Sequence, residues 1–191
     1  MRSLLNRPEL GAACGVVAIW SFFSLYAGGS GFLSWAGSAT YLEIASQLGI
    51  LAAAVSLLMI AGEFDLSVGS MIAASGMTIS LFCERLGWSI WGGIAVAMAL
   101  SLGVGLANGL VVVRTKLPSF IVTLGSLFIL SGGTIGMTRL VTGRTQVGGL
   151  HQALLYGSAE AIFASRIGGF SVSVLWWVGI TVFATWVLLR T

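Results

Sequence analysis

Charged residues are the scarcest class in this chain. Only 8% of its 191 residues are charged and 57% are hydrophobic, and the mean hydropathy is +1.02. A soluble domain carries roughly 25% charged residues, so this composition excludes an ordinary soluble domain and predicts an integral membrane protein. The 27 glycines agree with this prediction, because glycine is more frequent in transmembrane helices than in soluble ones.

Cysteine, histidine and basic clusters are also scarce. Cys14 and Cys83 are far apart in apolar runs, which provides neither metal-ligand spacing nor a disulfide framework. His151 has no second histidine, cysteine or carboxylate at ligand spacing. The net charge of +3 comes from scattered residues, so nothing supports nucleic-acid binding. We therefore expect membrane lipid around the chain, and no cofactor, metal or nucleic acid bound to it.

Catalytic and nucleotide-binding motifs are missing as well. The sequence contains no HExxH, no GxSxG, no Walker loop and no paired intramembrane aspartates. We therefore do not expect an enzyme. If ATP drives this protein, a different subunit must bind the ATP.

Apolar runs separated by charges predict six membrane-spanning helices, because a spanning helix needs about 20 mainly apolar residues. The expected ranges are about 10–27, 44–62, 66–83, 88–113, 119–137 and 171–189. The expected fold class is therefore all-α, a polytopic transmembrane helix bundle. Small residues four apart within 105–109 and 132–136 predict tight packing between helices. The connection 138–170 is polar, apart from a mildly apolar stretch around 153–164.

The distribution of basic residues predicts that both chain ends are cytoplasmic. This orientation places five basic residues inside: Arg2, Arg7, Arg114, Lys116 and Arg190. The external connection 28–43 then has no basic residue. Three arginines in the longest connection count against it: Arg139, Arg144 and Arg166.

The stretch Gly62–Met71 places two carboxylates, Glu63 and Asp65, between two apolar runs. An ionised acid at bilayer depth costs at least about 2.5–3.5 kcal/mol, so both should reach water or a partner. One interpretation is a solvated loop in which Asp65 or Ser67 caps the third helix. The other is a broken helix that faces a polar cavity. Asn108, deep in an apolar span, favours an interhelical hydrogen bond over a role in a pathway.

Three motifs together resemble the permeases of bacterial ABC importers for simple sugars, the ribose and xylose type, in a wider family shared with branched-chain amino-acid permeases. They read Gly-Glu-Phe-Asp-Leu-Ser-Val-Gly-Ser at 62–70, Ala-Asn-Gly at 107–109 and Leu-Pro-Ser-Phe-Ile-Val-Thr-Leu-Gly at 117–125. The first motif is much more specific than any pair of small residues.

The resemblance implies an inner-membrane permease subunit that pairs with a second copy, receives sugar from a periplasmic binding protein and couples to an ABC ATPase subunit. The signature and translocation pathway would involve Glu63, Asp65, Ser67, Gly69 and Asn108. Cytoplasmic contacts would involve Arg114, Lys116 and Pro118, and Pro118 is well placed to start a helix. The connection 138–170 would face the binding protein.

Permeases of this family are longer and have more spans. Residues 1–191 are therefore expected to form the N-terminal part of one transmembrane permease domain, without the C-terminal spans and the main ATPase-coupling loop. Two other functions stay open. The chain could belong to a branched-chain amino-acid permease, or it could be a truncated membrane protein that does not transport.

Overall fold

The computed structural model describes residues 8–190, so Arg2 and Arg7 lie outside the described part. Its helices are α1 (Pro8–Ala27), α2 (Trp35–Ile60), α3 (Val68–Leu86), α4 (Ile90–Thr115), α5 (Ser119–Thr142), α6 (Tyr156–Phe163) and α7 (Ser173–Arg190). Two short 3-10 turns, η1 (Gly28–Ser30) and η2 (Leu150–Gln152), and one antiparallel hairpin of β1 (Arg166–Ile167) and β2 (Phe170–Ser171) complete it. The predicted all-α fold class is confirmed.

Five helical stretches are long and apolar enough to cross a membrane: Leu10–Ser30, Trp35–Ile60, Ile90–Thr115, Ser119–Thr142 and Ser173–Arg190. The chain is thus a multi-pass membrane protein. The expected third span is the exception among the six predicted, and it corresponds to α3. At 19 residues α3 is long enough, but its hydroxyl side chains and the Glu84–Arg85 pair reduce its hydropathy. It packs against both α4 and α5 instead of presenting an apolar surface on all sides.

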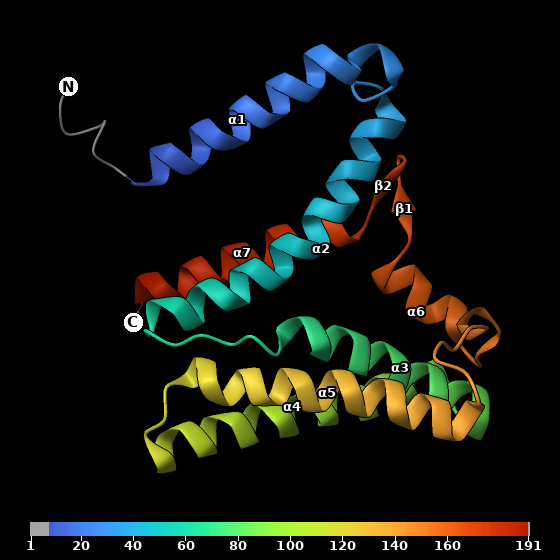
Figure 1. Ribbon diagram of the computed structural model, residues 1–191. Helices are drawn as coiled ribbons and strands as arrows, with labels where there is room; N and C mark the ends of the chain where they lie inside the picture. The colour runs from blue at the N-terminus through green and yellow to red at the C-terminus, as the bar shows by residue number, and fades with distance from the viewer. Residues whose placement is uncertain (1–7, 191) are drawn as a thin grey trace.

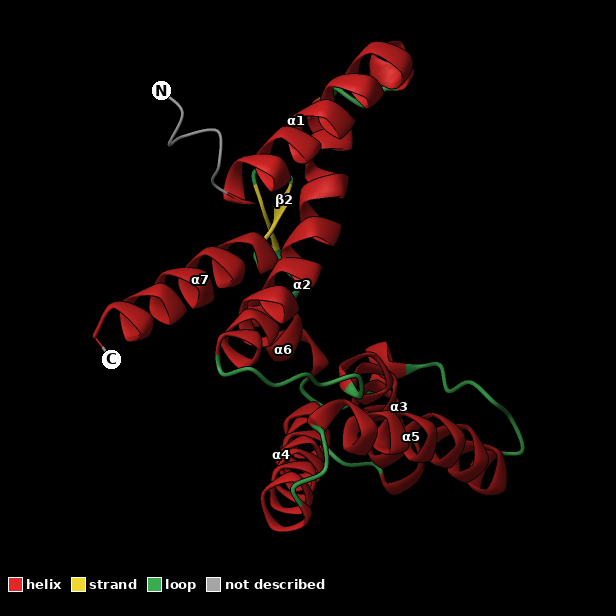
Figure 2. Ribbon diagram, turned by 60° about the vertical axis from the view of Figure 1, so that its left-hand side comes forward, coloured by secondary structure: helices red, strands yellow, loops and turns green. Residues whose placement is uncertain are grey.

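The helices form two groups, α2 with α7 and α3 with α4 and α5 (Figures 1 and 2). Helix α1 contacts η1 and extends away from both groups (Figure 1). Glycines leave room for close contacts within each group. Gly49 of α2 lies directly against the indole of Trp177 in α7, and a Cβ at Gly93 of α4 would lie 3.1 Å from Cys83 Sγ of α3.

The glycines predicted to mediate packing lie elsewhere. A Cβ at Gly105, Gly109, Gly132 or Gly136 would meet nothing within 4 Å. These four glycines therefore do not mediate the close contacts within this chain, and the prediction of tight packing at 105–109 and 132–136 stays a prediction. The spacing of small residues defines a helix face, but it does not identify the neighbouring helix.

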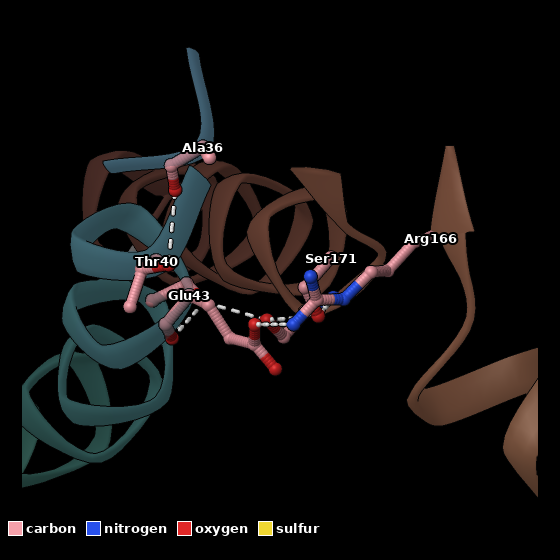
Figure 3. A network of polar contacts seen from close by, with 7 residues as sticks. Ala36, Thr40, Glu43, Arg166 and Ser171 are labelled. Carbon is pink, nitrogen blue, oxygen red and sulfur yellow. Dashed lines mark hydrogen bonds and ion pairs between the residues drawn. The ribbon is translucent and has the colours of Figure 1, made fainter. Parts of the chain in front are cut away.

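Helix α2 begins at Trp35, nine residues before the expected start at 44. Ser34 caps it, since its hydroxyl accepts a hydrogen bond from Gly37 N at 3.0 Å. Glu43 therefore lies within α2, where its carboxylate pairs with Arg166 of β1 at 2.9 Å (Figure 3). The Arg166 side chain is 60% exposed, so this pair contributes at most about 1 kcal/mol. The pair joins the hairpin to α2.

Indole N–H groups from three helices hold the connection between α5 and α7. Trp35 of α2 donates to Gly168 O, Trp91 of α4 donates to Ser158 Oγ and Trp176 of α7 donates to Ile162 O, each at 2.9 Å. Three buried serines extend this anchoring between α2 and α7: Ser46, Ser171 and Ser173. The expected apolar stretch around 153–164 corresponds to α6, which lies between the two groups of helices (Figure 1).

Candidate functional site

The signature stretch interrupts the helical structure between α2 and α3. Gly62 adopts a left-handed conformation with φ of +81°, which glycine adopts without a steric penalty. Gly62 N donates to Met59 O at 3.0 Å and Glu63 N to Leu58 O at 3.1 Å. These two bonds are those of a Schellman motif, and they satisfy carbonyls that the end of α2 would otherwise leave unpaired. Helix α2 therefore stops at a defined position.

Residues 63–67, here called the extended segment, follow this stop and run without helical structure to the start of α3. Two hydroxyls of α5 hold the segment by its backbone. Phe64 N donates to Ser119 Oγ at 3.0 Å, and Leu66 N donates to Thr123 Oγ1 at 3.1 Å. The first and third family motifs are thus in direct contact.

Asp65 lies at the centre of the extended segment and organises the start of α3. Its Oδ1 accepts hydrogen bonds from Ser67 N at 2.7 Å and from Ser67 Oγ at 2.6 Å, which is an Asx turn. A carboxylate beside the first turn of α3 is also favoured by the helix dipole. Asp65 Oδ2 makes no hydrogen bond within residues 8–190. One oxygen therefore caps α3 and the other is available to a ligand.

Two cavities adjoin the extended segment. The first, of about 380 Å³, lies between α2, α3 and α4, and its wall includes Leu51, Asp65, Ser67, Met71, Ser75 and Gly105. The second, of about 240 Å³, lies between the end of α2, α4 and α5, and its wall includes Glu63, Asp65, Gly105, Asn108, Ser119 and Thr123. Asp65 and Gly105 belong to both walls. Each cavity is mainly apolar with a few polar groups, which is typical of sites for small molecules.

The acidic stretch combines features of both interpretations. Asp65 accepts hydrogen bonds from Ser67 at the start of α3, and it lines two mainly apolar cavities beside the break between α2 and α3. Glu63 is half-buried in the wall of the second cavity. Ser67 is buried and bonded to Asp65. Gly69 lies in the first turn of α3, where it is exposed and lines neither cavity.

Asn108 makes the expected interhelical hydrogen bond. Its Oδ1 accepts from Ser126 Oγ of α5. Its Nδ2 is buried and has no hydrogen-bond partner within residues 8–190. An unpaired buried donor costs about 1–3 kcal/mol, and Asn108 carries this cost in the wall of the second cavity.

The three residues expected to make cytoplasmic contacts lie together on the short connection between α4 and α5. Arg114 is in the last turn of α4, Lys116 is its C-cap with φ of +57°, and Pro118 is the N-cap of α5. All three are exposed. Pro118 directly precedes the helix that it was expected to start.

Reasoning from the sequence missed Ser119 and Thr123 as site residues, although both belong to the third motif. A signal was available, because two hydroxyl residues four positions apart share one face of a helix. The signal does not name the partner of that face, and the partner is the extended segment.

Comparison with known proteins identifies the family. A family model described as branched-chain amino acid transport system / permease component matches residues 38–191. The xylose transport system permease protein XylH of Escherichia coli K12 is 36% identical over 138 residues, which cover 72% of this chain and 35% of that protein. XylH of Haemophilus influenzae is 32% identical over 84% of this chain and 43% of its own length.

A third relative is similar along the whole of this chain. The autoinducer 2 import system permease protein LsrC of Enterobacter sp. strain 638 is 28% identical over 191 residues, which are 52% of its length. The chain thus spans about a third to a half of the relatives it matches. No solved structure matches it. The resemblance seen in the three motifs is confirmed. The chain belongs to the ABC-importer permease family whose family model is described as branched-chain amino acid transport system / permease component.

Proposed function

We propose that this chain forms part of the permease subunit of an ATP-driven importer for a simple sugar. The observation that carries the proposal is the position of Asp65. A helix break places its carboxylate in the walls of two adjoining cavities, where one oxygen holds the structure and the other is unpaired. Non-helical backbone at membrane depth is tolerated where it lines a cavity.

The chemistry of the two walls suits a ligand with hydroxyl groups. A hydroxyl can both donate and accept hydrogen bonds. It can therefore donate to the free oxygen of Asp65, whereas Nδ2 of Asn108 is buried and would become available only if the wall of the second cavity opened. Glu63 and Ser67 lie on the same walls, so these four residues form the proposed pathway. Gly69 would act in the first turn of α3 by leaving that surface free of a side chain.

The proposed orientation has a cytoplasmic N-terminus, with the α4–α5 connection and the end of α7 on the same side of the membrane. Figure 1 has these ends on one side of the molecule and α6 with the hairpin on the other. Arg114, Lys116 and Pro118 would then face an ABC ATPase subunit. The expected connection 138–170, of which 138–142 belong to α5, would face a periplasmic sugar-binding protein. A second permease copy would complete the subunit pair.

Deleting the gene in its own host tests the substrate class. We expect uptake of labelled D-xylose or a related sugar to fall and uptake of L-leucine to stay unchanged. The opposite result would identify an amino-acid permease. Unchanged uptake of every sugar and branched-chain amino acid would contradict a role in transport and favour a non-transporting membrane protein.

Replacing Asp65 in the chromosomal gene tests the site. We expect Asp65→Asn to lower sugar uptake roughly tenfold or more, the factor that corresponds to losing one charge-assisted hydrogen bond. Glu160→Gln is the matched control, because Glu160 is an exposed acid on α6 away from both cavities. If the two variants transport equally at equal expression, Asp65 only caps α3.

A further inference from the structure

The contact between the extended segment and α5 joins two backbone N–H donors to two hydroxyl acceptors. Residues four apart in a helix share a face and are about 6 Å apart along the axis. Phe64 and Leu66 are two apart, and Ser119 and Thr123 are four apart. One face of the helix thus offers two hydroxyl acceptors to the two N–H donors.

The hydroxyls of Ser119 and Thr123 are not needed to complete the hydrogen bonds of α5 itself. Ser119 is the first residue of the helix, and its N-cap Pro118 makes no side-chain cap hydrogen bond. The Ser119 hydroxyl is not used to cap the helix either. It accepts from Phe64 N instead. Thr123 is 4% exposed, accepts from Leu66 N and donates to Ser119 O at 2.9 Å. Its accepting capacity is therefore directed to the extended segment.

The residue between the two contacts is Asp65. Since Phe64 and Leu66 are fixed on either side of it, the backbone of Asp65 cannot shift along α5 without breaking a hydrogen bond. The exposed connection between α4 and α5 adjoins this same end of α5, because only Leu117 and Pro118 separate Lys116 from Ser119. A movement of that connection would therefore reach the extended segment through the first turn of α5.

We propose that Ser119 and Thr123 are positioning residues whose hydroxyls hold the extended segment against α5 and thereby place Asp65 in the wall between the two cavities. The consequence for transport rests on the proposed function, whereas the structural part does not. Ser119 and Thr123 act on Asp65 through the backbone of its neighbours.

Hydrogen exchange tests the structural part on the purified chain in lipid nanodiscs. We expect Thr123→Val to speed exchange of the Leu66 amide roughly two- to tenfold, the factor equivalent to one lost hydrogen bond. Ser119→Ala should act in the same way on the Phe64 amide. Thr123→Ser retains a hydroxyl and should restore the exchange rate to within about twofold.

Thr78→Val is the matched control for the Thr123 substitution. Thr78 is a half-buried threonine of α3 whose hydroxyl bonds only to Ala74 O of its own helix. Its replacement should leave exchange of the Phe64 and Leu66 amides unchanged. Equal exchange in Thr123→Val, Thr78→Val and the wild type would overturn the proposal. Faster exchange along the whole chain would identify general unfolding, and this result would also overturn it.

Measurements of sugar uptake then distinguish a positioning role of Thr123 from a role in stability alone. For labelled D-xylose, Thr123→Val should change KM or the maximal rate per folded molecule, and Thr123→Ser should recover it. A variant that only reduces the amount of folded protein leaves both values unchanged, and this outcome would limit Thr123 to stability. If the wild type transports no sugar while the exchange results hold, the proposed function fails and the structural part of the proposal stands.

Discussion

The packing of α2 against α7 requires that residue 49 has no side chain, because Gly49 lies against the indole of Trp177. A Cβ at residue 49 would lie 2.7 Å from Trp177 Cδ1 and closer still to Nε1. An added methyl group in a packed site costs about 1–3 kcal/mol. Replacing glycine by alanine inside a helix gains about 1 kcal/mol. We therefore expect Gly49→Ala to lower the free energy of unfolding by up to about 2 kcal/mol.

Gly179→Ala in α7 is the control for this substitution. A Cβ at Gly179 meets nothing within 4 Å, so only the gain in helix propensity applies, and this variant should be stabilised by up to about 1 kcal/mol. Stability is measured by denaturant unfolding in mixed micelles, followed by tryptophan fluorescence. In a Trp177→Leu background, Gly49→Ala should become neutral or stabilising, because its obstacle is removed. Equal stability of Gly49→Ala and Gly179→Ala would refute the reasoning.

The same unfolding assay checks two further predictions. Ser46→Ala should destabilise the protein by about 1 kcal/mol, because the hydroxyl is fully buried and bridges Glu43 O and Ser173 Oγ; an unchanged unfolding curve would show that this bridge contributes nothing. Lys116→Gly should stabilise it by about 1 kcal/mol, since a left-handed conformation strains any residue with a Cβ; a loss of stability would contradict this.

The sequence alone was sufficient for the class of fold, because charge is rare and apolar runs are long. Helix boundaries were harder to predict, since charges were used as markers. Glu43 was taken as the end of a span, but it lies inside α2, where Arg166 compensates its charge. Helix α3 was expected to be a span like the others. Its hydroxyl residues are accommodated by packing against α4 and α5, which no single segment reveals.

The candidate site was predictable in its acidic part and not in its support. Two acids in an apolar sequence must have a physical reason, and this argument singled out Glu63 and Asp65. It could not decide between a role at the start of α3 and a place in a cavity wall, and Asp65 has both positions in the structure. The spacing of Ser119 and Thr123 indicated a shared helix face but not its partner, because that partner is a segment 55 to 57 positions earlier in the chain.

Helix α6 connects the two groups of helices. Trp91 of α4 binds it at Ser158, and Trp176 of α7 binds it one turn later at Ile162. The ring of Phe163 lies about 6 Å from both indoles, with centroid distances of 6.1 and 6.0 Å. The two indole hydrogen bonds and the ring of Phe163 thus connect the α2–α7 group to the α3–α5 group through one short helix.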